Sequence, residues 1–136
     1  MSKFGTIKTS MKDGKLLIEA LSIMGLKGIK NFIGNPQQLE GYEGRFRNER
    51  ADIIVPRQYV GHASNDLGFR RNPITGMFEA IISDFDSNRF NARWLQNLQV
   101  EYNQADIAVK MKIQGWKLVN TGIKANGNRK LAYQPI

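Results

Sequence analysis

His62 is the single histidine of the chain, and it lies with Ser64 and Asp66 in the polar segment 59–66. These are the residue types of a nucleophile, its general base and the group that orients the base. Three neighbours on one loop rarely converge in that geometry, so we expect an ordinary surface histidine. The chain also has no cysteine, which removes thiol catalysis and cysteine-ligated metals. The sequence therefore predicts no nucleophilic centre.

A second acidic motif, D-x-D-x-N, begins at Asp84 and has the spacing of the first three ligands of a calcium loop. Arg89 stands where that loop needs glycine, and Leu95 stands where it needs a bidentate glutamate. These acids fit better at the end of a strand and the start of a helix. We expect no metal, no cofactor and no catalytic residue. The one enzyme-like alternative is a ligand pocket to which Asp66 and Asp84 contribute carboxylates.

Arginines are concentrated in the middle of the chain, and Phe46, Tyr59 and Phe69 lie between them. Guanidinium groups make planar contacts with phosphates or carboxylates, and aromatic rings offer planar groups a face for stacking. Alternatively, the arginines pair with neighbouring acids and the aromatic residues belong to the core. We expect an anionic partner to contact these residues: Arg45, Arg47, Arg50, Arg57, Arg70 and Arg71.

The charge of the chain is strongly basic and unevenly placed. Twenty Lys and Arg residues against 12 Asp and Glu residues give a net charge of +8. Residues 107–136 carry six basic side chains and no acid, around an Asn126-Gly127 pair that predicts a two-residue hairpin turn. Such a field attracts an anionic partner, although lysines also serve solubility. From this end of the chain we expect contributions from Lys117, Lys124, Arg129 and Lys130.

The periodicity of apolar residues predicts the elements that must position these side chains. Alternation and β-branched runs predict strands at 3–9, 29–33, 51–55, 66–70, 77–84, 116–124 and 129–133. Helical spacing predicts helices at 12–24 and 90–113, and the segment around Gly41 and Gly44 is expected to be a loop. The order β-α-β-β-β-β-α-β-β indicates a single α+β domain over residues 1–136, with a mostly antiparallel sheet covered by two helices.

The second predicted helix carries one apolar stripe over about six turns. Its residues are Trp94, Leu95, Leu98, Tyr102, Ala105, Val109 and Ile113. We expect five residues of this stripe to be buried against the sheet: Trp94, Leu98, Tyr102, Ala105 and Val109.

Short motifs also occur in a fixed order over nearly the whole chain. They are M-S-K-F-G-T-I-K-T at 1–9, G-Y-E-G at 41–44, A-D-I-I-V at 51–55, D-L-G-F at 66–69, F-E and a later aspartate within 78–84, and G-W at 115–116. In this order they resemble the Ycf35 family, a family of unknown function from plastids, cyanobacteria and their phages. Lys3 and Asn103-Gln104 stand where that family often has histidines, so family histidine chemistry is not expected here.

The resemblance implies a cytoplasmic or plastid-stromal protein with no established enzymatic activity. No apolar run approaches the roughly 20 residues of a membrane span. We therefore expect a non-enzymatic accessory protein that docks on an acidic protein surface of a photosynthetic or gene-expression assembly. The alternative is RNA or DNA binding through the arginine stretch and the basic C-terminal hairpin. The lesser alternative is the ligand pocket at Asp66 and Asp84. Exposed aromatic residues beside the arginines would favour nucleic acid.

Overall fold

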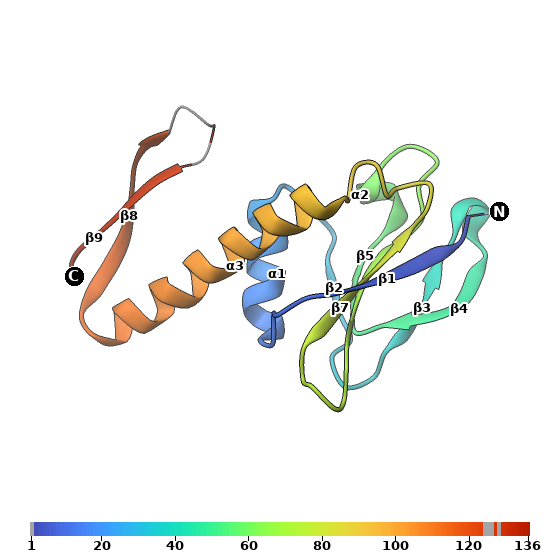
Figure 1. Ribbon diagram of the computed structural model, residues 1–136, viewed down its shortest axis with the longest axis horizontal. Coiled ribbons are helices and arrows are strands. Elements are labelled where there is room, and N and C mark those ends of the chain that lie inside the picture. The colour runs from blue at the N-terminus through green and yellow to red at the C-terminus, as the bar shows by residue number, and fades with distance from the viewer. Residues whose placement is uncertain (1, 124–126, 128) are drawn as a thin grey trace. The chain divides into compact units, whose positions relative to one another are not determined.

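The computed structural model describes residues 2–123, 127 and 129–136 (Figure 1). The chain divides into two compact units, Met1–Tyr102 and Asn103–Ile136. None of the helices in the described part is long and apolar enough to cross a membrane. The elements are, in order, β1 (Phe4–Lys8), α1 (Gly14–Ile23), β2 (Lys30–Asn31), β3 (Gln37–Glu40), the 3-10 helix η1 (Tyr42–Gly44), β4 (Phe46–Ala51), β5 (Ile53–Val55), α2 (Arg57–Val60), β6 (Leu67–Arg71), β7 (Phe78–Ser83), α3 (Ala92–Ile113), β8 (Trp116–Ile123) and β9 (Arg129–Pro135).

A five-stranded sheet forms the centre of the first unit, and it is antiparallel as the sequence predicts. Its strand order is β1-β7-β6-β5-β2, and every neighbouring pair runs antiparallel. The predicted strands at 66–70 and 77–84 correspond to β6 and β7, which form a hairpin. Its turn is stabilised by the Asn72 side chain, whose Oδ1 accepts from the backbone N–H of Ile74 at 2.8 Å. The α+β class is therefore confirmed.

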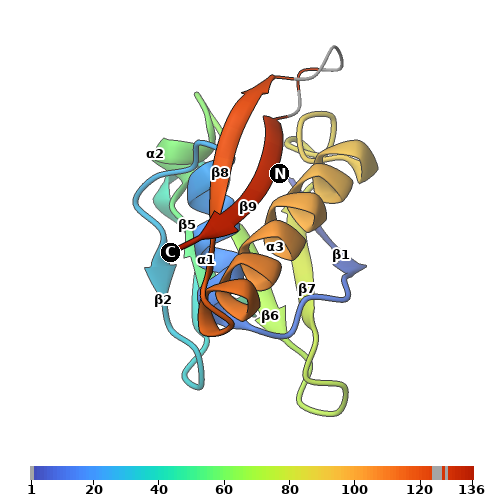
Figure 2. The ribbon, with the colours of Figure 1, turned by 90° about the vertical axis from the view of Figure 1, so that its left-hand side faces the viewer.

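Helix α1 and the part of α3 that belongs to the first unit, up to Tyr102, cover one face of this sheet (Figure 2). Asp13 begins α1 as the N-cap, because its carboxylate accepts from the N–H groups of Lys15 and Leu16 at 2.9 and 3.2 Å. Leu17 and Leu21 are then buried on the face that α1 turns to the sheet. The first part of α3 is fixed to the same point, since Tyr102 Oη accepts from the N–H of Asp13 at 2.9 Å.

The apolar stripe of α3 is buried over only part of its length. Leu98, Tyr102 and Ala105 are buried, and Trp94 is half-buried with its ring edge-on to Phe90 at 4.7 Å. The prediction that Val109 is buried is wrong, because its side chain is 48% exposed, and Ile113 at the end of the stripe is 81% exposed. The periodicity identifies the apolar face of the helix, but it carries no signal for where the cover over that face ends.

The β3–β4 hairpin covers the other face of the sheet, where the sequence analysis expects a loop (Figure 1). Leu39 and Ala51 of the hairpin form a buried cluster with Ile54 of β5 and Ile81 of β7. Gly68 of β6 makes this contact possible, since a Cβ there would lie 2.8 Å from the Ala51 Cβ and 2.9 Å from Leu39 Cδ2. The first unit thus has three layers: helices, sheet and hairpin.

The second unit contains the predicted C-terminal hairpin, formed by antiparallel β8 and β9. A two-residue turn at Asn126-Gly127 would pair Ile123 with Lys130, but the observed register pairs Ile123 with Arg129. The register also shifts by one residue between Asn120 and Gly122. The sequence also predicts that Lys124 and Lys130 lie close across this turn, a prediction that depends on a residue outside the described part of the chain. Lys124 and Asn126 themselves lie outside the described residues.

Candidate functional site

A cleft of about 770 Å³ lies in the first unit, where the tip of the β3–β4 hairpin meets the start of the chain and the end of β7. Two predicted arginines, one predicted aspartate and two aromatic residues are among its lining residues. The full set of lining residues is Ser2, Gly41, Tyr42, Glu43, Arg45, Arg47, Asn65, Asp84 and Phe85.

The hairpin tip presents Tyr42 and Arg45 to solvent because its backbone is tightly turned. The Gly41 N–H donates to the Arg45 carbonyl at 2.7 Å, and the Gly44 N–H donates to the Gly41 carbonyl at 3.0 Å. Glu43 and Gly44 both have positive φ, 74° and 80°, and this conformation is easy only for the glycine. The tip therefore forms one wall of the cleft with a backbone that closes on itself.

Asn65 ties this wall to the end of β7. Its Oδ1 accepts from the Tyr42 N–H at 2.9 Å, and its Nδ2 donates to Ser83 Oγ at 3.0 Å. Ser83 Oγ donates in turn to Asp86 Oδ2 at 2.7 Å, and the same carboxylate oxygen accepts from the Asn65 N–H at 3.2 Å. All these side chains except that of Tyr42 are buried. Such a connected network holds both walls in a fixed geometry.

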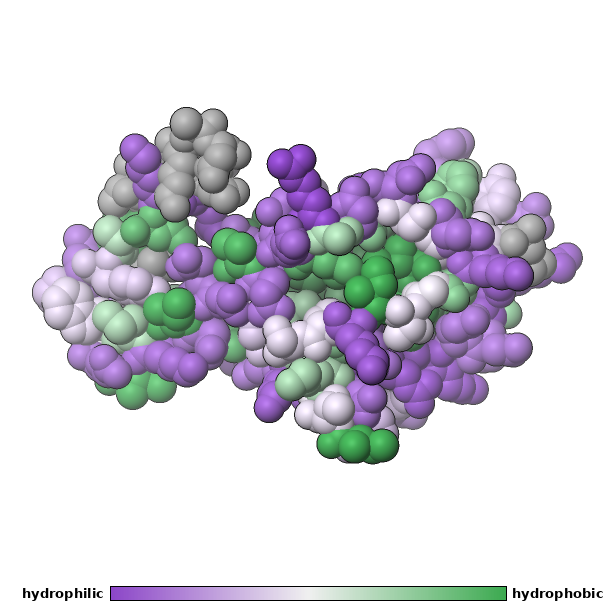
Figure 3. Space-filling model, viewed as in Figure 1, coloured by the Kyte–Doolittle hydropathy of each residue, from purple (hydrophilic) through white to green (hydrophobic). Residues whose placement is uncertain are grey.

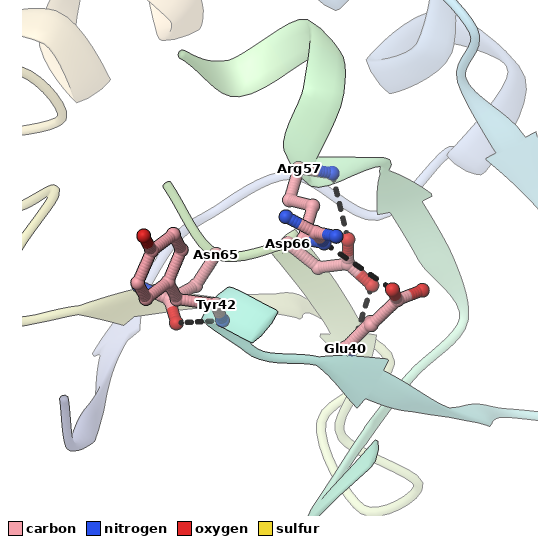
Figure 4. Close-up of polar contacts among 5 residues, drawn as sticks. All are labelled: Glu40, Tyr42, Arg57, Asn65 and Asp66. Carbon is pink, nitrogen blue, oxygen red and sulfur yellow. Dashed lines mark hydrogen bonds and ion pairs between the residues drawn. The ribbon is translucent and has the colours of Figure 1, made fainter. Parts of the chain in front are cut away.

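Asp66 serves the architecture rather than the cleft (Figure 4). Its Oδ2 accepts from the Glu40 N–H and its Oδ1 from the Arg57 N–H, both at 2.7 Å, so one carboxylate joins β3 to the start of α2. Burial raises the pKa of Asp66 above its ordinary 3.8, although both backbone N–H groups lower it, and the nearby Glu40 carboxylate raises it further. Arg57 balances Glu40 through an ion pair at 3.2 Å.

Asp84 does line the cleft, but Asp66 is not among its lining residues. The Asp84 Oδ1 accepts from the Lys3 N–H at 3.2 Å, which fixes the start of β1 beside the end of β7. His62 is exposed on the α2 loop, while Ser64 is buried. In the part of the chain that the structure describes, no group of three His, Asp or Glu side chains is placed to hold a metal ion.

The predicted arginines do not form one surface. Arg45 and Arg47 line the cleft, and the Arg47 guanidinium lies over the Phe4 ring at 5.4 Å. The other four lie elsewhere: Arg50 donates to the Pro36 carbonyl at 3.4 Å, Arg57 pairs with Glu40, Arg70 is opposite Glu79 in the β6–β7 register, and Arg71 stacks on Phe78 at 5.0 Å.

The basic residues of the C-terminal hairpin belong to the second unit. Lys117 is exposed and lies opposite Gln134, and Lys130 is exposed and lies opposite Gly122. Arg129 is half-buried. It lines a separate cavity of about 460 Å³ together with Lys130, Leu131, Tyr133, Gln104 and Ile107. These basic residues therefore form a second basic region, which belongs to a different unit of the chain from the cleft residues Arg45 and Arg47.

The aromatic residues of the cleft are the part that sequence reasoning missed. Tyr42 is 54% exposed and Phe85 is 56% exposed, although apolar rings of this size are usually covered. Of the aromatic residues expected between the arginines, Phe69 is in the core, while Phe46 and Tyr59 are exposed. Tyr42 had a signal in its G-Y-E-G motif, whereas Phe85 stands between two aspartates that drew attention only as metal ligands.

A family model described as "Protein of unknown function (DUF1257)" matches residues 26–132. The match includes the cleft residues from Gly41 to Phe85 and the basic residues of β8 and the start of β9. No curated protein and no solved structure matches this chain.

Proposed function

Because the chain belongs to the DUF1257 family, whose function is unknown, we propose a function from the cleft itself: the protein binds single-stranded nucleic acid. The observation that carries this proposal is that two exposed aromatic rings, Tyr42 and Phe85, line the same cleft as Arg45 and Arg47. Exposed rings beside arginines distinguish nucleic-acid binding from docking on an acidic protein, because bases need a face on which to stack. An acidic protein surface makes no such demand.

The two aromatic and the two arginine side chains of the cleft would contact different parts of a nucleotide. Each ring that stacks on a base contributes about 1–3 kcal/mol, and the contribution is nearly independent of sequence. Arg45 and Arg47 offer planar guanidinium groups to phosphates. The volume of the cleft, about 770 Å³, is in the range of pockets that enclose a nucleotide-sized group.

Two acids in the cleft restrict what can bind there. Glu43 and Asp84 balance the charges of Arg45 and Arg47, so the cleft has no net charge of its own. Carboxylates accept hydrogen bonds from the exocyclic amino groups of bases and repel phosphates. We therefore expect the bases to enter the cleft while long-range attraction comes from the lysines of the chain, including the exposed Lys117 and Lys130.

The test is fluorescence anisotropy with a labelled single-stranded RNA of mixed sequence, about 12 nucleotides long, and the corresponding duplex. The parent should bind the single strand in preference to the duplex. Tyr42→Ala and Phe85→Ala should each lose about 1–3 kcal/mol of binding free energy, which weakens the affinity by a factor of roughly 5 to 150. Tyr59→Ala is the matched control, because Tyr59 is a similarly exposed ring that lines a different cavity.

Docking on an acidic protein surface remains the second candidate function. It is favoured by the concentration of exposed lysines near the C-terminus, where Lys110, Lys112 and Lys117 are all exposed. Competition with poly-L-glutamate separates the two proposals. If this polymer displaces the RNA at equal charge concentration, and the two ring variants bind like the parent, the affinity is charge alone and the acidic-protein proposal replaces the first.

We also infer that the family is the one known as Ycf35, which would give the protein a cytoplasmic or stromal setting in photosynthetic organisms or a place among their phages. The support is the order of the short motifs from residue 1 to residue 116. Retention on RNA from a cyanobacterial lysate, lost after nuclease treatment, would agree with this setting and with the proposed function.

A further inference from the structure

β1 is an edge strand with one open side. It pairs with β7 along its whole length, and in the described part of the chain no strand pairs with its other side (Figure 2). Gly5, Thr6, Ile7 and Lys8 are all exposed. An open strand edge presents unpaired N–H and C=O groups and is a template for pairing with another strand.

The pairing with β7 determines which backbone groups of β1 are unused. The Asp84 N–H donates to the Lys3 carbonyl at 2.8 Å, and the Thr9 N–H donates to the Phe78 carbonyl at 3.2 Å. Backbone direction alternates along a strand, so the odd-numbered residues between them also face β7. The N–H and C=O groups of Phe4, Thr6 and Lys8 therefore point to the open side.

The side chains along this edge border an apolar groove beside the start of α3. The apolar part of a cavity of about 470 Å³ consists of Phe4, Gly5 and Ile7 of β1, Ile82 of β7 and Phe90. Its polar lining residues are Lys3, Thr6, Asp84, Ser87 and Asn91. Leu95 lines a second cavity that shares Ile7. Hydrophobic surface is visible around β1 in the space-filling view (Figure 3). The glycine leaves room, because a Cβ at Gly5 would have the Ile82 carbonyl oxygen at 3.9 Å as its nearest neighbour.

We propose that this edge is the interface of a homodimer in which two copies of β1 pair antiparallel about a twofold axis through Thr6. In that register Phe4 lies opposite Lys8 of the second copy and Thr6 lies opposite itself. Phe4, Thr6 and Lys8 are the residues whose N–H and C=O groups point outward. In each opposed pair, the N–H of either residue can therefore donate to the C=O of the other. A twofold interface must be self-complementary, and this edge meets that condition.

The side chains favour a second copy as the occupant and favour this register. Ile7 of each copy lies opposite Gly5 of the other, so a large side chain meets a small one over the apolar groove. Lys8 lies opposite Phe4 rather than opposite another lysine. A shift of two residues toward the C-terminal end of β1 would place the two Lys8 side chains diagonally across the strands, where like charges repel. The inference does not depend on the nucleic-acid cleft.

Sedimentation of the full chain at about 100 µM, where weak dimers are populated, tests the proposal. The parent should sediment as a dimer. Thr6→Pro should weaken the dimer at least tenfold, because it removes the outward N–H at the twofold axis without touching the pairing with β7. Thr6→Val is the matched control and should remain dimeric, since it keeps the N–H and the branched shape. A monomeric parent, or a Thr6→Pro variant that associates like the parent, overturns the proposal.

The register has its own test, which does not need the proline variant to fold. Thr6→Lys and Thr6→Glu should each associate more weakly than the parent, and an equal mixture of the two should recover a heterodimer. The same pair of changes at the exposed Thr75 should have no such effect. In the parent, exchange of the Thr6 amide with solvent should slow as concentration rises, whereas Ile7 should be protected throughout. A Thr6 amide that exchanges fast at every concentration refutes the interface.

Discussion

Gly68→Ala should destabilise the protein, although an alanine in place of glycine usually does the opposite. Gly68 does not have a left-handed backbone, so alanine fits its conformation. The lower entropy of the unfolded chain would then stabilise the variant by about 0.4–1 kcal/mol. The new Cβ, however, would lie 2.8 Å from the Ala51 Cβ and 2.9 Å from Leu39 Cδ2. The sign of the effect therefore depends on whether these neighbours can move.

The two neighbours differ in this respect. The Leu39 methyl group is the end of a flexible side chain and gives way at small cost. The Ala51 Cβ moves only if the backbone of β4 moves, and with it the hairpin that carries Arg47. Overpacking of a buried site costs about 1–3 kcal/mol. After the entropic gain is subtracted, we expect Gly68→Ala to lower the free energy of unfolding by about 1–2 kcal/mol.

Urea unfolding of Gly68→Ala, Ala51→Gly and the double variant measures this directly. Ala51→Gly alone should cost about 1–2 kcal/mol through the lost methyl group and the added backbone freedom. The double variant should be more stable than the sum of the two single effects predicts, by about 1–2 kcal/mol, because the clash is gone. If Gly68→Ala is as stable as the parent, the hairpin does not pack on β6 as described, and the cleft wall it supports is misplaced.

Three further predictions concern α3, Asp66 and His62. Leu98→Ala should cost about 2–5 kcal/mol in urea unfolding, whereas Val109→Ala should stay within about 0.5 kcal/mol; equal effects would mean that the stripe is buried throughout. Burial raises the pKa of Asp66, so above about pH 3.8 the folded protein still holds a proton that the unfolded chain has released. The free energy of unfolding should therefore fall as pH rises from about 3.8 through the raised pKa of Asp66. Asp66→Asn should flatten this fall, and an unchanged pH profile would contradict it. His62→Gln should leave both the free energy of unfolding and RNA affinity unchanged, and a loss of affinity with the fold intact would implicate this histidine.

The strands of the sheet could be predicted where their residue types are those of buried strands. Ile53, Ile54 and Val55 form a β-branched run and are all buried, so pattern and structure agree. The pattern does not predict strand β4, Phe46–Ala51, because most of its side chains are exposed or half-buried. Its sequence, F-R-N-E-R-A, therefore resembles a polar loop. Its position depends on the Ala51 contact with Gly68, and no periodicity encodes that contact.

The cleft could be predicted only in part for a related reason. The arginine-rich composition pointed to Arg45 and Arg47, but it gave equal weight to Arg71, which instead stacks on Phe78. Tyr42 and Phe85 come from segments far apart in the chain, and they line one cleft because Asn65 joins the hairpin tip to the end of β7. Spacing along the sequence can identify neighbours on one element, but not residues that tertiary contacts bring together.

The β3–β4 hairpin forms a sheet of its own, so a local opening that detached it would leave the ladders of the five-stranded sheet intact. Detachment would remove one wall of the cleft and leave the open form with no binding site. Arg45, Arg47 and Arg50 lie on this hairpin, and each would become a trypsin cleavage site in the open form. Any ligand that occupies the cleft must therefore slow tryptic cleavage of this segment in proportion to its saturation, because it binds the closed form alone. Limited proteolysis can thus detect the ligand of this protein before its chemical identity is known.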